Sequence, residues 1–66
     1  MSSFGQKLTH DVHFLDHIKH EVPVQVYLNT THEDIGFVQS FSDHYIKMND
    51  VFYNRSQFKF ISRPGY

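Results

Sequence analysis

The sequence predicts a mainly β domain in which an N-terminal α-helix is followed by a small, strongly bent, five-stranded antiparallel barrel. Three observations support this fold class. Apolar residues occupy every second position from Val22 to Leu28, which is the period of a strand with one buried face. Gly36 lies inside the next apolar stretch, where a glycine indicates a bulge or a sharp bend. Before these strands, apolar residues recur at intervals of three or four, which is helical spacing.

The predicted helix runs from Leu8 to Glu21. Thr9 is its expected N-cap, and Asp11 suits the first turn, where the helix dipole favours negative charge. Pro23 ends the helix because the residue before a proline is disfavoured in the α conformation. Residues 1–7 contain two serines and a glycine and are predicted to be a flexible arm.

All elements after the helix are predicted to be strands. Their expected ranges are Val22 to Leu28, Ile35 to Phe41, Tyr45 to Met48, Val51 to Tyr53 and Phe58 to Ile61. Asn49 and Asp50 are a two-residue turn signal, because both residue types tolerate positive φ. Residues 62–66 form a tail, so residues 8–61 are predicted to make a single domain. A barrel with so few and such short strands leaves no internal cavity, which places any function on its surface.

The predicted core is made by apolar residues of the helix and of four strands: Leu15, Ile18, Val24, Val26, Leu28, Val38, Phe41, Ile46 and Phe60. The chain has 66 residues, and a domain of this size is marginally stable alone. It also has seven Phe and four Tyr. We therefore expect a homo-oligomer with an aromatic interface, or else an aromatic ligand surface. A few exposed tyrosines would be the simpler alternative.

Composition excludes several classes of protein. There is no cysteine, so neither disulfides nor thiolate metal sites can form. No apolar run approaches the roughly 18 residues that span a bilayer, and no hydrophobic signal region is present, so we expect a cytoplasmic protein without a membrane partner. The net charge of −1 is not that of a protein that coats duplex nucleic acid.

The charges are distributed unevenly along the chain. The last 20 residues carry four cations, Lys47, Arg55, Lys59 and Arg63, against the single acid Asp50.

The predicted order of elements is that of a small Sm-like or SH3-like barrel. A closer resemblance is carried by Phe14-Leu15, by the strand VPVQVYL from Val22 to Leu28, by Gly36 eight residues later, by Ser40-Phe41 and by Tyr53-Asn54-Arg55. In these segments the chain resembles a divergent member of Hfq, the bacterial Sm-like RNA chaperone family. The resemblance implies an RNA-binding protein, with RNA chaperone as the expected role, that acts as a homo-oligomeric ring joined by strand pairing.

The resemblance also implies two RNA sites. In the family, a Tyr-Lys-His segment lines the pore and contacts uridine-rich RNA, and here Tyr53, Asn54 and Arg55 stand in its place. A stacking aromatic of the family corresponds to His44. The opposite face of the family ring binds purine-rich RNA through a strand aromatic, which is Tyr27 here. The chain departs from the family where Asn54 and Arg55 replace Lys and His.

Tyr53, Asn54 and Arg55 suggest RNA binding on chemical grounds as well. A tyrosine ring can stack on a base, an amide can read a base edge, and a guanidinium supplies charge and a planar surface. The alternative is a turn in which Asn54 and Ser56 satisfy backbone groups while Arg55 is a solvated charge. The rival function is a small-barrel adaptor or regulator that binds a protein partner through a strand edge or an aromatic surface, without RNA.

Four histidines lie within one arc of the predicted helix, at His10, His13, His17 and His20. Pairs three or four residues apart can share a metal ion, so this face is a candidate site for Zn²⁺, Ni²⁺ or Cu²⁺. The alternative is a solvated polar face that gains charge in acid. Catalytic signatures are lacking, since there is no cysteine nucleophile, glycine-rich phosphate loop or HExxH motif. We therefore expect no enzyme activity, no catalytic residues and no cofactor.

Overall fold

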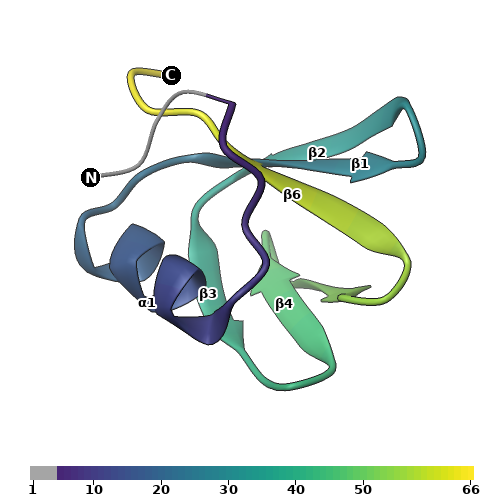
Figure 1. Cartoon of the computed structure of the whole chain (residues 1–66), viewed down its shortest axis with the longest axis horizontal. Helices are drawn as coiled ribbons and strands as arrows, with labels where there is room; N and C mark the ends of the chain where they lie inside the picture. The colour runs from purple at the N-terminus through teal and green to yellow at the C-terminus, as the bar shows by residue number, and fades with distance from the viewer. Residues whose placement is uncertain (1–4) are drawn as a thin grey trace.

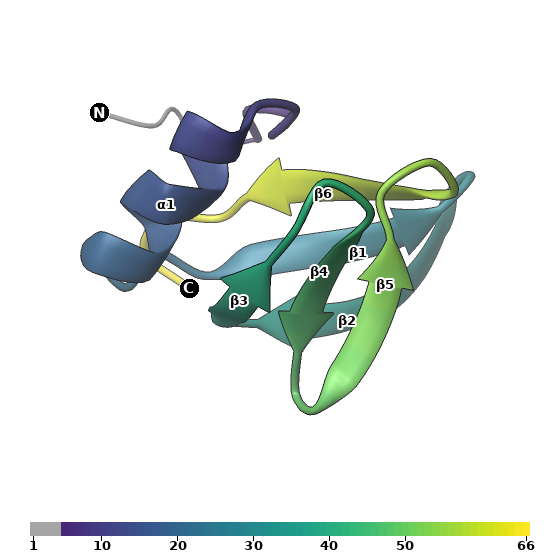
Figure 2. The same cartoon turned by 90° about the horizontal axis from the view of Figure 1, so that it is seen from below.

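The computed structural model describes residues 5–66, and these form a mainly β domain with one short N-terminal helix (Figure 1). The elements are α1 (Asp11–Lys19), β1 (Val24–Leu28), β2 (Thr31–Gly36), β3 (Val38–Phe41), β4 (Tyr45–Met48), β5 (Val51–Asn54) and β6 (Phe58–Ser62). The strands make two antiparallel sheets, one ordered β2-β1-β6 and one ordered β3-β4-β5. In Figure 2, β3, β4 and β5 cross in front of β1 and β2, and α1 lies beside β3 at one end. Within residues 5–66, no helix has the length and apolar character needed to cross a membrane.

The prediction of a five-stranded barrel is wrong in its strand number and in its closure, because six strands form two separate sheets. The predicted strand from Ile35 to Phe41 divides at Phe37, so that β2 pairs with β1 while β3 pairs with β4. The first part of β2 was missed because its residues are polar and exposed, which hides the alternation of a strand. Only Asn29 and Thr30 remain as the turn, with Asn29 at a φ of 56°.

The helix begins at Asp11 rather than at Leu8, and its N-cap is His10 instead of Thr9. The backbone N–H groups of Thr9 and His10 both donate to Nδ1 of His13, over 3.1 and 3.3 Å. An earlier start is prevented because the preceding residues are extended along β6, where the backbone N–H of Leu8 donates to the carbonyl of Phe60 over 2.8 Å.

Residues 1–4 of the predicted arm lie outside the described part of the chain, whereas residues 5–7 run beside β6 (Figure 1). Gly5 donates to the Ser62 carbonyl and Ser62 donates to the Gln6 carbonyl, each over 2.8 Å. Lys7 forms an antiparallel bridge with Ile61. The predicted tail also begins too early, because Ser62 is a fully buried residue of β6.

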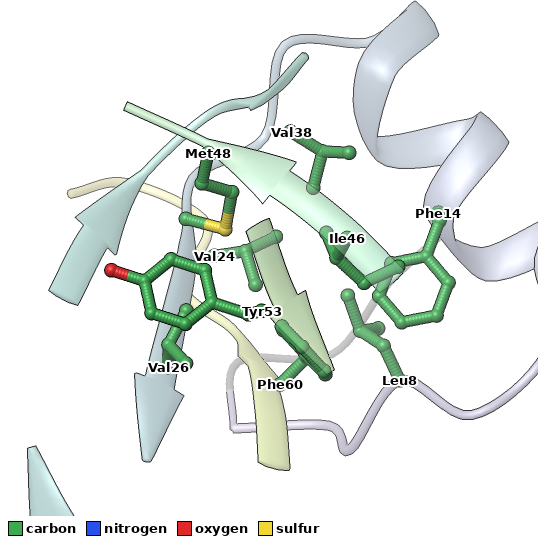
Figure 3. Close-up of a cluster of buried hydrophobic side chains, with 9 residues drawn as sticks. All are labelled: Leu8, Phe14, Val24, Val26, Val38, Ile46, Met48, Tyr53 and Phe60. Atoms are coloured by element: carbon green, nitrogen blue, oxygen red, sulfur yellow. The ribbon is translucent and has the colours of Figure 1, made fainter. Parts of the chain in front are cut away.

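The core fills the space between the two sheets, as Figure 3 shows. Its buried apolar members are Leu8, Phe14, Val24, Val26, Val38, Ile46, Met48, Tyr53 and Phe60. Five predicted core residues are confirmed as buried, namely Val24, Val26, Val38, Ile46 and Phe60, while Ile18 and Phe41 pack against the cluster. The predictions for Leu15 and Leu28 are wrong, because these side chains are 55% and 38% exposed. The helix turns Phe14 and His17 inward instead of Leu15.

Candidate nucleic-acid interface

Tyr53 belongs to the core, which removes it from the set of residues that can stack on a base. Its side chain points between the sheets (Figure 3), and only 9% of the residue is exposed. Its ring meets Phe58 edge to face, with centroids 5.1 Å apart. Its hydroxyl donates to Oδ2 of Asp34 over 2.7 Å. Burial, this hydrogen bond and the charges of Asp34 and Glu33 raise the pKa of Tyr53 from 10.0 to about 12.

Arg55 connects the helix to the second sheet and is not a solvated charge. Its Nη1 donates to Oδ1 of Asp11 over 2.6 Å and to the carbonyl of Ser42 over 2.7 Å. Its Nη2 donates to the carbonyl of Thr9 over 3.2 Å, and its guanidinium carbon lies 4.9 Å from the centroid of the Phe14 ring. Because the guanidinium is hydrogen-bonded to Asp11, Ser42 and Thr9, Arg55 has a structural role: it holds the helix and the segment before it against the β3-β4-β5 sheet.

His44 and Asn54 lie at the corner where β4 begins and β5 ends. The backbone N–H of Arg55 donates to the carbonyl of His44 over 2.9 Å, which holds this corner together. Oδ1 of Asn54 accepts hydrogen bonds from the backbone N–H and the hydroxyl of Ser56, as expected for a turn. The side chains of His44 and Asn54 are exposed. Of the predicted RNA residues at this corner, only these two present their side chains to a ligand.

The four histidines of the helix do not converge. His17 is 1% exposed, and its Nδ1 donates to the carbonyl of His13 over 2.7 Å while its Nε2 lies 2.7 Å from Oγ of Ser62. Nδ1 of His13 caps the helix, and Nε2 of His20 lies 3.4 Å from a carboxylate oxygen of Asp16. Within residues 5–66, no three potential metal-ligating side chains of His, Cys, Asp or Glu gather closely enough to hold a metal ion. The rings of His10 and His13 do lie close together, with centroids 5.3 Å apart. A metal ion shared by a pair of these histidines therefore stays a prediction.

Tyr27 lies on the other sheet, on the face that points away from the core. In the β2-β1-β6 sheet it is directly opposite His32 on one side and Lys59 on the other. Directly opposite residues present their side chains on the same face of a sheet, so these three form one row. The rings of Tyr27 and His32 meet edge to face at 6.0 Å. Tyr27 is half-buried, and its neighbour in sequence, Val26, is fully buried in the core.

Three of the chain's six Lys and Arg residues surround this tyrosine. Lys59 is its direct neighbour. Lys7 is opposite Ile61, two residues along β6, and therefore lies on the same face as Lys59. Arg63 reaches across β1, where its Nε donates to Oε1 of Gln25 over 2.6 Å and its Nη2 lies 3.4 Å from the Tyr27 hydroxyl. We refer to Tyr27, His32, Lys59, Lys7, Arg63, Gln25 and Ile61 as the Tyr27 face.

A cavity of about 400 Å³ is located beside this face, between residues 7–9 and residues 55–60. Lys7 and Lys59 are shared between the cavity and the Tyr27 face, and Asn29, Ser56 and Gln57 add polar groups to its lining. None of the described residues that line it is acidic.

The sequence did not predict Lys7, Lys59 and Arg63 as site residues, although a signal was present. Two of them belong to the basic C-terminal part of the chain. The sequence did not reveal that residues 5–7 pair with β6. This pairing places Lys7 near Lys59, although the two residues are far apart in the sequence.

A second, smaller aromatic group lies on the outer face of the β3-β4-β5 sheet. Lys47 and Phe52 are directly opposite each other, and Nζ of Lys47 is 5.3 Å from the Phe52 ring centroid. The rings of Tyr45 and Phe52 meet edge to face at 4.8 Å. Phe52 is 59% exposed. This group carries one cation, compared with three on the Tyr27 face.

Comparison with known protein families, with curated proteins and with solved structures finds no match for this chain. The resemblance to Hfq therefore rests on the sequence segments from Phe14 to Arg55 and stays a prediction.

Proposed function

We propose that this chain binds single-stranded RNA on the Tyr27 face. The observation that carries the proposal is the strand register, which places Tyr27 directly beside Lys59 and brings Lys7 to the same face from the other end of the chain. An aromatic ring surrounded by cations on a sheet surface is the arrangement with which proteins stack an unpaired base and hold its phosphates. Gln25 adds an amide that can read a base edge.

This role needs no bond to be made or broken in the RNA, so we propose a binding protein and not an enzyme. The chain's net charge of −1 argues against broad coating of duplexes, whereas three local cations suit a short single strand. Of the residues first predicted for RNA, Tyr27 is central to this proposal. His44 and Asn54 lie on the other sheet's corner, and Tyr53 and Arg55 have structural partners.

A chaperone role of the Hfq kind additionally requires several RNA sites in one assembly, because chaperone activity depends on holding more than one strand. In the ring that the resemblance to Hfq implies, the strand equivalent to β6 pairs with a neighbouring subunit, and here that edge is already paired with residues 5–8 from Phe60 to Ser62. A ring joined in that way would have to displace these residues. The proposed binding face does not depend on it, and a cytoplasmic location is the setting in which this face would meet RNA.

The test is binding of short U-rich and A-rich RNAs at about 50 and 200 mM salt. If the two exposed lysines of the face, Lys7 and Lys59, each neutralise one phosphate, affinity falls by about sevenfold over this range, from a slope of roughly −0.7 per phosphate. Lys59→Gln should weaken binding at low salt and reduce the slope by about one phosphate. Lys19→Gln is the matched control, because Lys19 is an exposed lysine on the last turn of α1 and does not belong to the β2-β1-β6 sheet that carries the Tyr27 face.

Two replacements of Tyr27 distinguish stacking of its ring on a base from the packing of its side chain on the sheet. Tyr27→Phe keeps the ring and should retain most of the affinity, whereas Tyr27→Leu keeps the apolar bulk and should lose about tenfold, since stacking is worth roughly 1–3 kcal/mol per base. Thermal unfolding of both variants must show an intact fold. Absence of binding at low salt, or equal loss with Lys59→Gln and Lys19→Gln, contradicts the proposal and favours the rival function of a protein-binding adaptor.

A further inference from the structure

The two sheets have four outer strand edges, and three of them are covered or protected. The edge of β6 is paired with residues 5–8 from Phe60 to Ser62, and before these residues it carries the exposed charge of Lys59. The edge strand β3 is in contact with helix α1. The edge strand β2 carries the charged or polar residues His32, Glu33 and Asp34, and its Ile35 carbonyl accepts a hydrogen bond from Asn49 over 3.2 Å. Such devices prevent unwanted strand pairing.

The fourth edge belongs to β5, and residues 5–66 give it none of these protections. The sequence of β5 is VFYN, without charge or proline. Val51 and Phe52 are 45% and 59% exposed. Within residues 5–66, β4 is the only strand with which β5 pairs.

The geometry of the hairpin decides which backbone groups of β5 are available. Asn49 and Asp50 have φ values of 50° and 63°, as in a two-residue turn, so the flanking pair Met48–Val51 is hydrogen-bonded. Hydrogen-bonded pairs alternate along an antiparallel ladder, and the N–H and C=O of Phe52 therefore point away from β4. No described residue bonds to either group. Phe52 thus presents one donor, one acceptor and an exposed ring at the same place.

We propose that β5 pairs antiparallel with β5 of a second copy of this chain. The two β3-β4-β5 sheets then become one six-stranded sheet, related by a two-fold axis near Phe52. A copy of the chain fits for three reasons. An isologous contact needs only the one edge that is unprotected, whereas a ring needs two different edges and that of β6 is occupied from Phe60 to Ser62. The strand is uncharged, so two identical strands do not repel. The domain is small and gains stability from added apolar burial.

The pairing gives Phe52 a partner for its backbone and for its ring. Each Phe52 N–H can donate to the Phe52 carbonyl of the other copy, and the two rings lie on the same face of the joined sheet. The side chain of Lys47, directly opposite Phe52 on β4, stays at the outer face and covers the rings. This contact is on a different sheet from the Tyr27 face, so it does not rest on the proposed RNA binding.

The test is the mass of the full chain in solution, measured by sedimentation equilibrium or light scattering from micromolar to millimolar concentration. We expect a monomer–dimer equilibrium. Phe52→Glu should weaken dimerisation at least tenfold, because it places two carboxylates together in the dimer while giving Lys47 a favourable neighbour in the monomer. Phe37→Glu is the matched control and should leave the dimer intact, since Phe37 is similarly exposed at 54% but lies between β2 and β3.

Hydrogen exchange of the Phe52 amide gives a second readout that does not depend on any variant. Its protection should rise with chain concentration in step with the dimer population, while amides of the β4-β5 pairing stay protected throughout. A monomer at every concentration, a mass larger than two chains, or equal dissociation by Phe52→Glu and Phe37→Glu each overturns the proposal. A stable monomer would instead favour capture of a partner's strand by this edge.

Discussion

The Tyr53 hydroxyl donates a 2.7 Å hydrogen bond to the Asp34 carboxylate and thereby joins β5 of one sheet to β2 of the other. The second oxygen of Asp34 accepts from the backbone N–H of Ile35 over 2.8 Å and from Nδ2 of Asn49 over 2.9 Å. One carboxylate therefore holds two strands and the β4-β5 turn in register. This network accounts for the inward orientation of the Tyr53 side chain.

Removal of this hydroxyl should destabilise the fold in a pH-dependent way. Tyr53→Phe is expected to lower the free energy of unfolding by about 2 kcal/mol near neutral pH, the value for a hydrogen bond to a charged group. Because the folded state raises the pKa of Tyr53 from 10.0 to about 12, it favours the neutral phenol. That contribution is fully present below pH 10 and is lost as pH rises from 10 to 12. Denaturant unfolding across this range measures the difference between parent and variant.

Tyr45→Phe is the matched control for this experiment, because the Tyr45 hydroxyl bonds no described residue. It should follow the parent at every pH. If the unfolding free energy of Tyr53→Phe falls between pH 10 and 12 as steeply as that of the parent, the ionisation of Tyr53 is not the cause of the pH dependence.

Arg55 should behave as a structural residue and not as an RNA contact. Arg55→Ala is expected to cost about 2 kcal/mol of unfolding free energy, because two backbone carbonyls and the Asp11 carboxylate lose their donor. Asp11→Asn should cost less than about 1 kcal/mol, since the Asp11 side chain is 61% exposed and its pairing is screened by water. Thermal or urea unfolding checks both values. An Arg55→Ala variant that is as stable as the parent but does not bind RNA would show that Arg55 is an RNA contact, as the sequence predicts.

Position 36 should need a glycine because the Asn49 side chain leaves no room for a Cβ atom, and not because the backbone there has a positive φ. Its φ lies outside the left-handed region, but an added Cβ would lie 2.9 Å from Nδ2 of Asn49. Gly36→Ala must therefore displace Asn49 from Asp34 and Ile35, at a cost of about 1–2 kcal/mol for two hydrogen bonds. In an Asn49→Gly background, which keeps the positive φ of the turn, Gly36→Ala should be nearly neutral. Equal costs in both backgrounds, measured by urea unfolding, would point to the backbone instead.

The parts of the fold that follow from local pattern were predictable. The alternation at Val24 and Val26 placed β1, and the Asn49-Asp50 signal placed the β4-β5 turn, with positive φ at both residues. The start of β2 and the pairing of residues 5–8 were not predictable, because neither segment has an apolar period. Their positions depend on backbone hydrogen bonds to distant strands, at Leu28 and Phe60 among others. Such pairing carries little sequence information.

The candidate site was less predictable than the fold, because its residues are brought together by segments that are distant in the sequence. Tyr27 and Tyr53 illustrate the difference. The alternation of β1 already places Tyr27 opposite the buried valines, whereas the sequence VFYN of β5 does not show that Tyr53 is its buried residue. His17 illustrates the point as well. It lies on a histidine-rich helix face, yet its ring is buried against Ser62, a residue at the opposite end of the chain.

The most direct test of RNA binding on the Tyr27 face is residue-by-residue mapping. In a ¹⁵N-labelled sample titrated with a short U-rich or A-rich RNA at about 50 mM salt, where phosphate contacts are strong, amide shifts should move most at Tyr27, Lys59, Ile61 and Lys7. Shifts at the corner of His44 and Asn54 should be small. A set of shifts centred on that corner or on Phe52, or no shifts at all, would contradict the assignment of RNA binding to the Tyr27 face.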